Sequence, residues 1–228
     1  MVAIMVAITI IGFVVLDLVL QAVRKKEEIA EKQVELEFSD FRVPMATFFY
    51  PGHTWVNILP TGDVHVGLDD FSRKVIGNIE HIEFPKEGRM LKQGESAFTV
   101  KSGSKTLTFL SPVDGEVIGI NRMMLSNPAE VSRNAYGSGW VLNLKPTNLS
   151  VNLKAMKIAE DAVAWLKVEL RRFREFALGE NLQHIKDELQ YEVGRTSQDG
   201  GFLTEGMLGR MDEEAVKYFE KEFLGRKE

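Results

Sequence analysis

The 228-residue sequence contains no cysteine. This absence excludes disulfide scaffolds, cysteine-ligated zinc or iron–sulfur centres, and thiol catalysis. Histidine is also scarce: the four histidines show neither HxH nor HExxH spacing, so we expect no metal site. The net charge of −5 is not that of a basic nucleic-acid binder, and we expect no nucleic-acid partner.

The sequence also lacks any local pattern of catalytic residues. No paired carboxylates, Ser-His-Asp arrangement or phosphate-binding glycine loop stands out, so we expect a protein that is not itself an enzyme. Hydrophobic residues make up 44% and charged residues 27% of the chain, which suits a packed core with a soluble surface. The length fits one domain with extensions, or two small domains.

A long apolar run opens the chain. Residues 1–23 include one charged side chain, Asp17, and a helix of that length spans the hydrocarbon core of a bilayer. No basic region precedes the run and no A-x-A site follows it, which favours a membrane anchor over the competing interpretation, a cleaved signal peptide. Arg24, Lys25 and Lys26 come next. By the positive-inside rule we expect a single-pass membrane protein whose main domain is cytoplasmic.

The anchor leads into a segment of mixed charge. We interpret residues 24–49 as a charged linker, because mixed-sign runs with sparse apolar positions are usually solvated. Asp17, within the anchor, either faces a partner helix or reaches toward the membrane interface.

Residues 50–146 change to short alternating strands with frequent turns, a pattern typical of a β-sandwich or small barrel. Two short helices are expected within this segment. One begins near Asp69 or Asp70 and ends at Gly77; the other has Asn127 as its N-cap and Pro128 at its first position, with Glu130 closing a capping box.

Residues 147–228 return to helical spacing. Apolar side chains at residues 156–177 predict an amphipathic helix that ends at Gly179. A second helical stretch is expected at residues 182–193 and a last helix at residues 212–224. We therefore predict a mainly β core with an N-terminal transmembrane helix and a C-terminal helical extension.

Several motifs in the β-rich segment follow one another in a familiar order. They are HTWV at 53–56, VGLDDF at 66–71, IGNI at 76–79, SPVDGEV at 111–117, NP at 127–128 and YGSGW at 136–140. In this order and spacing, residues 50–146 resemble the glycine cleavage system H protein, a member of the lipoyl/biotinyl domain family. The resemblance implies a flattened β-sandwich in which a lysine at a hairpin tip carries a lipoyl arm that reaches into partner enzymes.

The hairpin itself departs from the family pattern. Counted back from Ser111, the position of the family's lysine falls on Ser104, and a lysine follows one residue later at Lys105. Lys101 stands where the family has a glutamate. A shift of one residue turns a strand side chain to the opposite face unless the turn changes length.

Two functions are compatible with this departure. The first is a membrane-anchored adaptor or structural subunit without a lipoyl arm, whose partners are membrane proteins or enzyme-complex subunits, with the bilayer contacted through residues 1–23. The alternative is a lipoyl carrier that uses lipoylated Lys105 to shuttle a one-carbon (aminomethyl), acyl or sulfur group, as in glycine cleavage. Neither function assigns a catalytic residue or a metal ligand.

Overall fold

The structure of the protein is a computed structural model that describes residue 17 and residues 35–38, 41–178 and 205–226. The predicted anchor at residues 1–23 lies outside the described residues apart from Asp17, and the helical stretch expected at residues 182–193 lies wholly outside them. Within the described part of the chain, no helix has the length and apolar character needed to cross a bilayer.

Seven antiparallel strands form the larger sheet, in the order β12-β3-β4-β5-β11-β10-β7. In chain order they are β3 (Phe48–Tyr50), β4 (Thr54–Ile58), β5 (Val64–Leu68), β7 (Met90–Leu91), β10 (Gly115–Ile120), β11 (Leu142–Pro146) and β12 (Lys157–Ile158). Val66 lies opposite Val56 on one side and Leu142 on the other, and all three are fully buried. A slip of one residue would turn this row toward solvent, so burial fixes the register.

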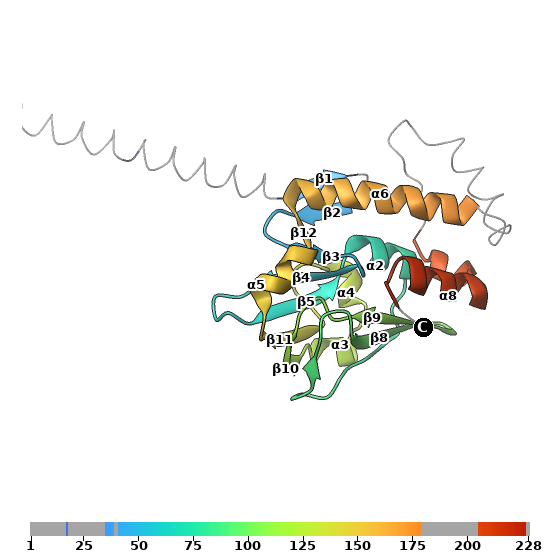
Figure 1. The fold of residues 1–228 in the computed structure, drawn as a ribbon. Helices are drawn as coiled ribbons and strands as arrows, with labels where there is room; N and C mark the ends of the chain where they lie inside the picture. The colour runs from blue at the N-terminus through green and yellow to red at the C-terminus, as the bar shows by residue number, and fades with distance from the viewer. Residues whose placement is uncertain (1–16, 18–34, 39–40, 179–204, 227–228) are drawn as a thin grey trace, which may run out of the picture.

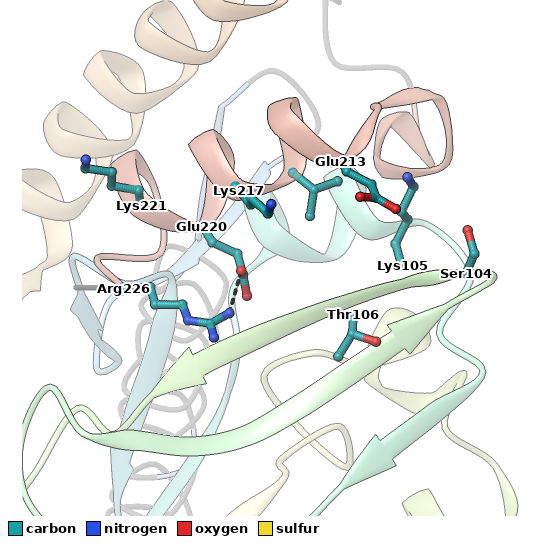
Figure 2. A pocket seen from close by; sticks show the side chains of 9 residues that line it. Ser104, Lys105, Thr106, Glu213, Lys217, Glu220, Lys221 and Arg226 are labelled. Atoms are coloured by element: carbon teal, nitrogen blue, oxygen red, sulfur yellow. Dashed lines mark hydrogen bonds and ion pairs between the residues drawn. The ribbon is translucent and has the colours of Figure 1, made fainter. Parts of the chain in front are cut away.

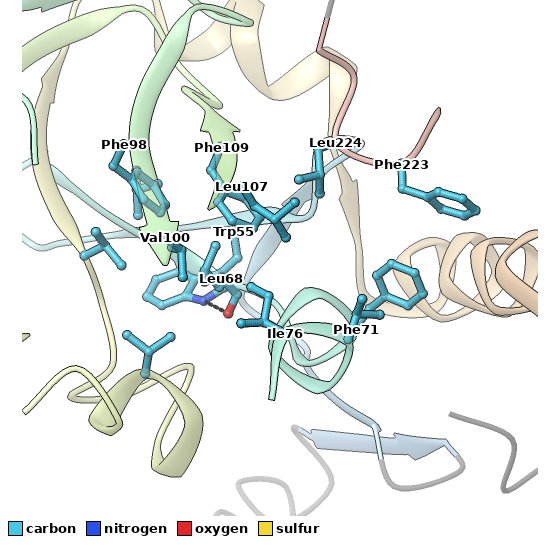
Figure 3. Close-up of a cluster of buried hydrophobic side chains, with 14 of the residues drawn as sticks. Trp55, Leu68, Phe71, Ile76, Phe98, Val100, Leu107, Phe109, Phe223 and Leu224 are labelled. Carbon is cyan, nitrogen blue, oxygen red and sulfur yellow. Dashed lines mark hydrogen bonds between the residues drawn. The ribbon is translucent and has the colours of Figure 1, made fainter. Parts of the chain in front are cut away.

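A smaller sheet packs on one face of the larger one. It contains β6 (His81–Glu83), β8 (Ser96–Ser102) and β9 (Lys105–Leu110) in the order β6-β8-β9. Val100 and Leu107 are cross-strand partners in this sheet and are buried, and Figure 3 shows them gathered with Trp55 and Leu68 of the larger sheet. The predicted β-sandwich core is confirmed.

A glycine makes room for the largest core side chain. The Trp55 indole N–H donates a hydrogen bond of 2.9 Å to the carbonyl of Leu68, which satisfies its polar group inside the core. A Cβ at Gly67 would lie 2.5 Å from Cζ2 of the Trp55 ring, so the indole lies directly over the backbone of β5. Any larger residue at position 67 would therefore displace the tryptophan.

The first predicted helix is confirmed as α2, which spans Asp70–Ile76. Asp69 is its N-cap, and the carboxylate accepts the backbone N–H of Ser72 at 2.9 Å. Gly77 ends the helix with a φ of 73°, a left-handed conformation that favours glycine.

The second predicted helix differs from the structure. Two single-turn helices, α3 (Met123–Ser126) and α4 (Glu130–Arg133), replace it. Asn127 ends α3 as its C-cap, and α4 begins after Ala129 without a side-chain cap, so the predicted capping box is wrong. The Glu130 carboxylate instead accepts the hydroxyl of Ser138 at 2.7 Å, which connects α4 to the loop that follows it.

The described part of the expected linker, residues 35–38 and 41–49, is structured. Strands β1 (Glu35–Phe38) and β2 (Phe41–Pro44) pair as a separate two-stranded sheet, and β3 begins at Phe48. Phe41 and Val43 are buried in the core. This part of the segment belongs to the folded domain and is not a solvated spacer.

The C-terminal helices pack on the sandwich. They are α5 (Leu149–Asn152), the 3₁₀ turn η1 (Leu153–Ala155), α6 (Ala159–Leu178), the 3₁₀ turn η3 (Met207–Arg210) and α8 (Glu213–Glu222). Figure 1 shows α6 and α8 close to α2 on one side of the sandwich. Phe173 of α6 and Phe219 of α8 are fully buried and meet Phe71 of α2, with ring centroids 5.4 and 6.3 Å from that of Phe71. The extension therefore shares the core of the β domain.

Candidate functional site

The hairpin between β8 and β9 is the candidate site, because it contains both lysines singled out by the sequence. Ser102 pairs with Lys105, which leaves Gly103 and Ser104 as a two-residue turn. Gly103 has a φ of 57°, and a positive φ at the first turn residue is favoured by glycine in such hairpins. Ser104 is exposed at the tip, at the position where the resemblance to the H protein implies a lysine.

The register places the two lysines on opposite faces of the hairpin. Lys105 shares a face with buried Leu107, two residues further along β9, and its side chain is half-buried. Lys101 pairs with Thr106 on the other face and forms an ion pair with Glu83 of β6. Lys105 is therefore directly beside the tip and faces the C-terminal extension.

A pocket of about 550 Å³ separates the hairpin from α8. Its lining comprises Ser104, Lys105 and Thr106 from the hairpin and Glu213, Val216, Lys217, Glu220, Lys221 and Arg226 from the C-terminal segment. Figure 2 shows Lys105 directed from the strand toward α8. The α8 residues recur every three or four positions, so they form one face of the helix above the hairpin.

Glu220 attaches α8 to the edge of the small sheet. Its Oε1 atom accepts the backbone N–H of Thr108 at 2.8 Å, and its Oε2 atom accepts a hydrogen bond of 2.6 Å from Nη1 of Arg226. Since β9 is an edge strand, this N–H would otherwise lack a partner in the sheet. This contact fixes the position of α8 relative to β9, the strand that begins at Lys105.

A second cluster lies inside the domain, around His53 of the HTWV motif. The imidazole is fully buried; its Nδ1 is 2.7 Å from Oδ2 of Asp69, and its Nε2 is 3.9 Å from Oε2 of Glu169 on α6. Burial alone would lower the pKa of His53, but the charge and hydrogen bond of Asp69, with a further contribution from Glu169, raise it to about 9.

The charged His53 joins three parts of the chain. It connects the start of β4 to the N-cap of α2 and to α6, and the ring stacks on Phe71 with centroids 4.1 Å apart. A side chain with no exposed surface cannot exchange protons with a bound substrate, so this cluster is structural. Across the described residues, no group of three or more histidine, aspartate or glutamate side chains is arranged to hold a metal ion.

Comparison with known proteins identifies the family. A family model described as "Glycine cleavage H-protein" matches residues 48–169, more than half of the chain. The chain belongs to the glycine cleavage H-protein family. The resemblance found in residues 50–146 is confirmed, and the match extends beyond it into α6, which contains the Glu169 partner of His53.

Two individual relatives agree with this assignment. A probable glycine cleavage system H protein of Pyrococcus abyssi is 32% identical over 132 residues, which cover 58% of this chain and 98% of the relative. The glycine cleavage system H protein of Thermus thermophilus is 32% identical over 108 residues, which cover 47% of this chain and 83% of the relative. A crystal structure of the H protein from Mycobacterium marinum matches with a TM-score of 0.44 and 25% identity, covering 46% of this chain and 87% of that one.

Proteins of the H-protein family carry lipoate on a lysine and are not themselves catalytic. The hairpin of this chain provides a partial fit to that group. Ser104 at the tip has no amine to acylate, whereas Lys105 beside it has one and lines a pocket that extends beneath α8. In this hairpin, Lys105 is the lysine nearest the turn and is the residue that could hold a lipoyl group.

Sequence reasoning missed the residues that α8 and α6 contribute. Glu220 bonds to β9 from 112 positions away, Lys217 and Lys221 line the same pocket, and Glu169 approaches His53 from a similar separation in sequence. The available signal was the charged stripe at four-residue spacing in the last helix, at positions 213, 217 and 221.

Proposed function

We propose that the chain is a non-catalytic carrier of the H-protein type, with a lipoyl arm attached to Lys105. Membership of a lipoyl carrier family supports the function, and the position of Lys105 directly beside the hairpin turn supports the residue. When attached, the lipoyl group supplies a dithiolane that accepts a one-carbon, acyl or sulfur group. The Lys105 ammonium must first lose its proton; the neutral amine then attacks the acyl carbon of an activated lipoate, the bond to the activating group breaks as that group leaves, and the amide forms. The partners of such a carrier are enzyme subunits of a glycine-cleavage type of complex.

Intact mass spectrometry of the protein isolated from its native cells, followed by peptide mapping of the hairpin, tests this function. We expect one lipoyl increment located on Lys105 and lost in the variant Lys105→Arg. The variant Lys101→Arg is the matched control, because it changes a lysine of the same hairpin that faces the other side and forms an ion pair. An unmodified Lys105, in cells whose other lipoyl proteins are fully modified, would refute the carrier function.

The second candidate is an adaptor without an arm. One observation favours it: the exposed tip position that the family uses holds Ser104, and the neighbouring Lys105 is half-buried under the C-terminal extension. An unmodified hairpin together with stable co-purification of enzyme subunits would support the adaptor.

We further propose that residues 1–23 anchor the protein in a membrane as a single-pass protein with the main domain in the cytoplasm. The proposal rests on the apolar sequence of this segment and on the basic cluster that follows it. Extraction of membranes at alkaline pH is the test, with a variant that lacks residues 1–23 as the control. Release of the full chain into the soluble fraction would refute the anchor. Protection of the main domain from protease in right-side-out vesicles tests whether that domain lies on the cytoplasmic side of the membrane.

A further inference from the structure

The pocket at the hairpin is lined by more cationic than anionic side chains. Four positive side chains, Lys105, Lys217, Lys221 and Arg226, surround it with two carboxylates, Glu213 and Glu220. The oxygens of Glu220 are already occupied by the β9 backbone and by Arg226. Three lysine side chains therefore line the pocket with one remaining carboxylate.

Lys217 and Lys221 stand one helical turn apart on the pocket face of α8, and both are exposed. Like charges at this spacing repel each other and destabilise a helix by about 0.2–0.5 kcal/mol. Within the part of the chain that the structure describes, neither lysine forms an ion pair. An anion bound between the two ammonium groups would remove this repulsion.

The size of the pocket points to a molecule larger than a bare ion. Its volume of about 550 Å³ lies in the range of small-molecule sites. Buried Val216 and the aliphatic stems of the lysines supply apolar wall, and the ammonium groups supply charge at its rim. This combination matches an organic molecule with an apolar body and an anionic end.

We propose that the pocket between the β8–β9 hairpin and α8 binds a free small organic anion with a carboxylate or phosphate group. Lys217 and Lys221 hold the anionic group, and Val216 contacts the body of the molecule. The pocket also contains Lys105, so the proposal concerns the chain whose Lys105 carries no lipoyl group; the two principal cations come from α8 and not from the hairpin. It gives the C-terminal extension a role in binding a ligand.

Titration of the full chain with Lys105 unmodified, held in a non-ionic detergent at fixed ionic strength, tests the site. The probes are succinate and inorganic phosphate, with methylammonium as the cationic control. Backbone amide NMR shifts of Lys105 and Thr106 report occupancy of the pocket. The double variant Lys217→Gln/Lys221→Gln removes the two cations, and Lys154→Gln/Lys157→Gln removes two exposed lysines that do not line the pocket.

We expect saturable binding of at least one of the two anions and none of methylammonium. Loss of the two α8 lysines should weaken the affinity about tenfold, since two partly solvated charge contacts are removed. The control double variant should bind as the unchanged protein does. The proposal is overturned if neither anion saturates the shifts, or if both double variants weaken binding equally, as nonspecific attraction would. The mass measurement on Lys105 decides the carrier function independently of this titration.

Discussion

Truncation of Phe219 to alanine tests whether the C-terminal extension is part of the domain core. The Phe219 ring is fully buried, and its centroid is 5.8 Å from that of Phe173, 5.2 Å from that of Phe223 and 6.3 Å from that of Phe71. Removing such a ring loses its burial and leaves a cavity, at a cost of about 3–5 kcal/mol. We expect the free energy of unfolding of the variant Phe219→Ala to fall by that amount in urea denaturation.

Tyr218→Ala is the matched control, because Tyr218 is the neighbouring aromatic residue of α8 and is 46% exposed. Its ring stacks on Phe176 at 5.0 Å, so the control should cost no more than about 1 kcal/mol. Tryptophan fluorescence follows the sandwich through Trp55 and Trp140 and the extension through Trp165. Two separate transitions, or equal losses in the two variants, would show that α8 is an independent appendage and would refute the shared core.

Three further changes test the buried contacts. The pKa of His53 is raised from 6.5 to about 9, so its stabilising effect is complete below pH 6.5 and is lost as pH rises through 9. In denaturation experiments at a series of pH values, the free energy of unfolding of the native protein should fall by up to about 3 kcal/mol over that range, relative to that of His53→Gln. In the variant Glu169→Gln the same fall should occur at lower pH. Gly77→Ala would place a Cβ 2.5 Å from Cα of Gly206 at a φ of 73°, and should cost more than about 1 kcal/mol in thermal unfolding. Glu220→Ala leaves a β9 backbone N–H without its acceptor, at a cost of about 1–3 kcal/mol, and hydrogen exchange at that amide should accelerate.

Local signals in the sequence were sufficient for the elements whose contacts are local. The alternation in β9 predicts a strand with one buried face, and the Asp69–Asp70 pair with Gly77 predicts the two ends of α2. The Asn127–Glu130 pattern failed because competing partners are nearby: the backbone N–H of Asn127 bonds to α3, and the Glu130 carboxylate accepts from Ser138. A capping motif predicts a helix only where no other partner captures its side chains.

The docking of the extension could not be predicted from local signals. An amphipathic stripe indicates that a helix has an apolar face and does not specify which surface covers that face. The contact between Phe71 and Phe219 joins residues 148 positions apart (219 minus 71), and no spacing rule acts over that distance. The cationic pocket has the same origin, because it exists only once α8 is placed over the hairpin.

The C-terminal extension also helps to fix the position of Lys105. Moving Lys105 to the tip would require β9 to slide by one residue against β8, which would turn Leu107 out of the core. The same slide would remove the Thr108 N–H from the carboxylate of Glu220, which sits on a separately packed helix. Two long-range contacts therefore oppose the only register that would give this chain the family's presentation of its lysine. An enzyme that lipoylates the protein must reach an amine beside the tip, on the face nearest α8.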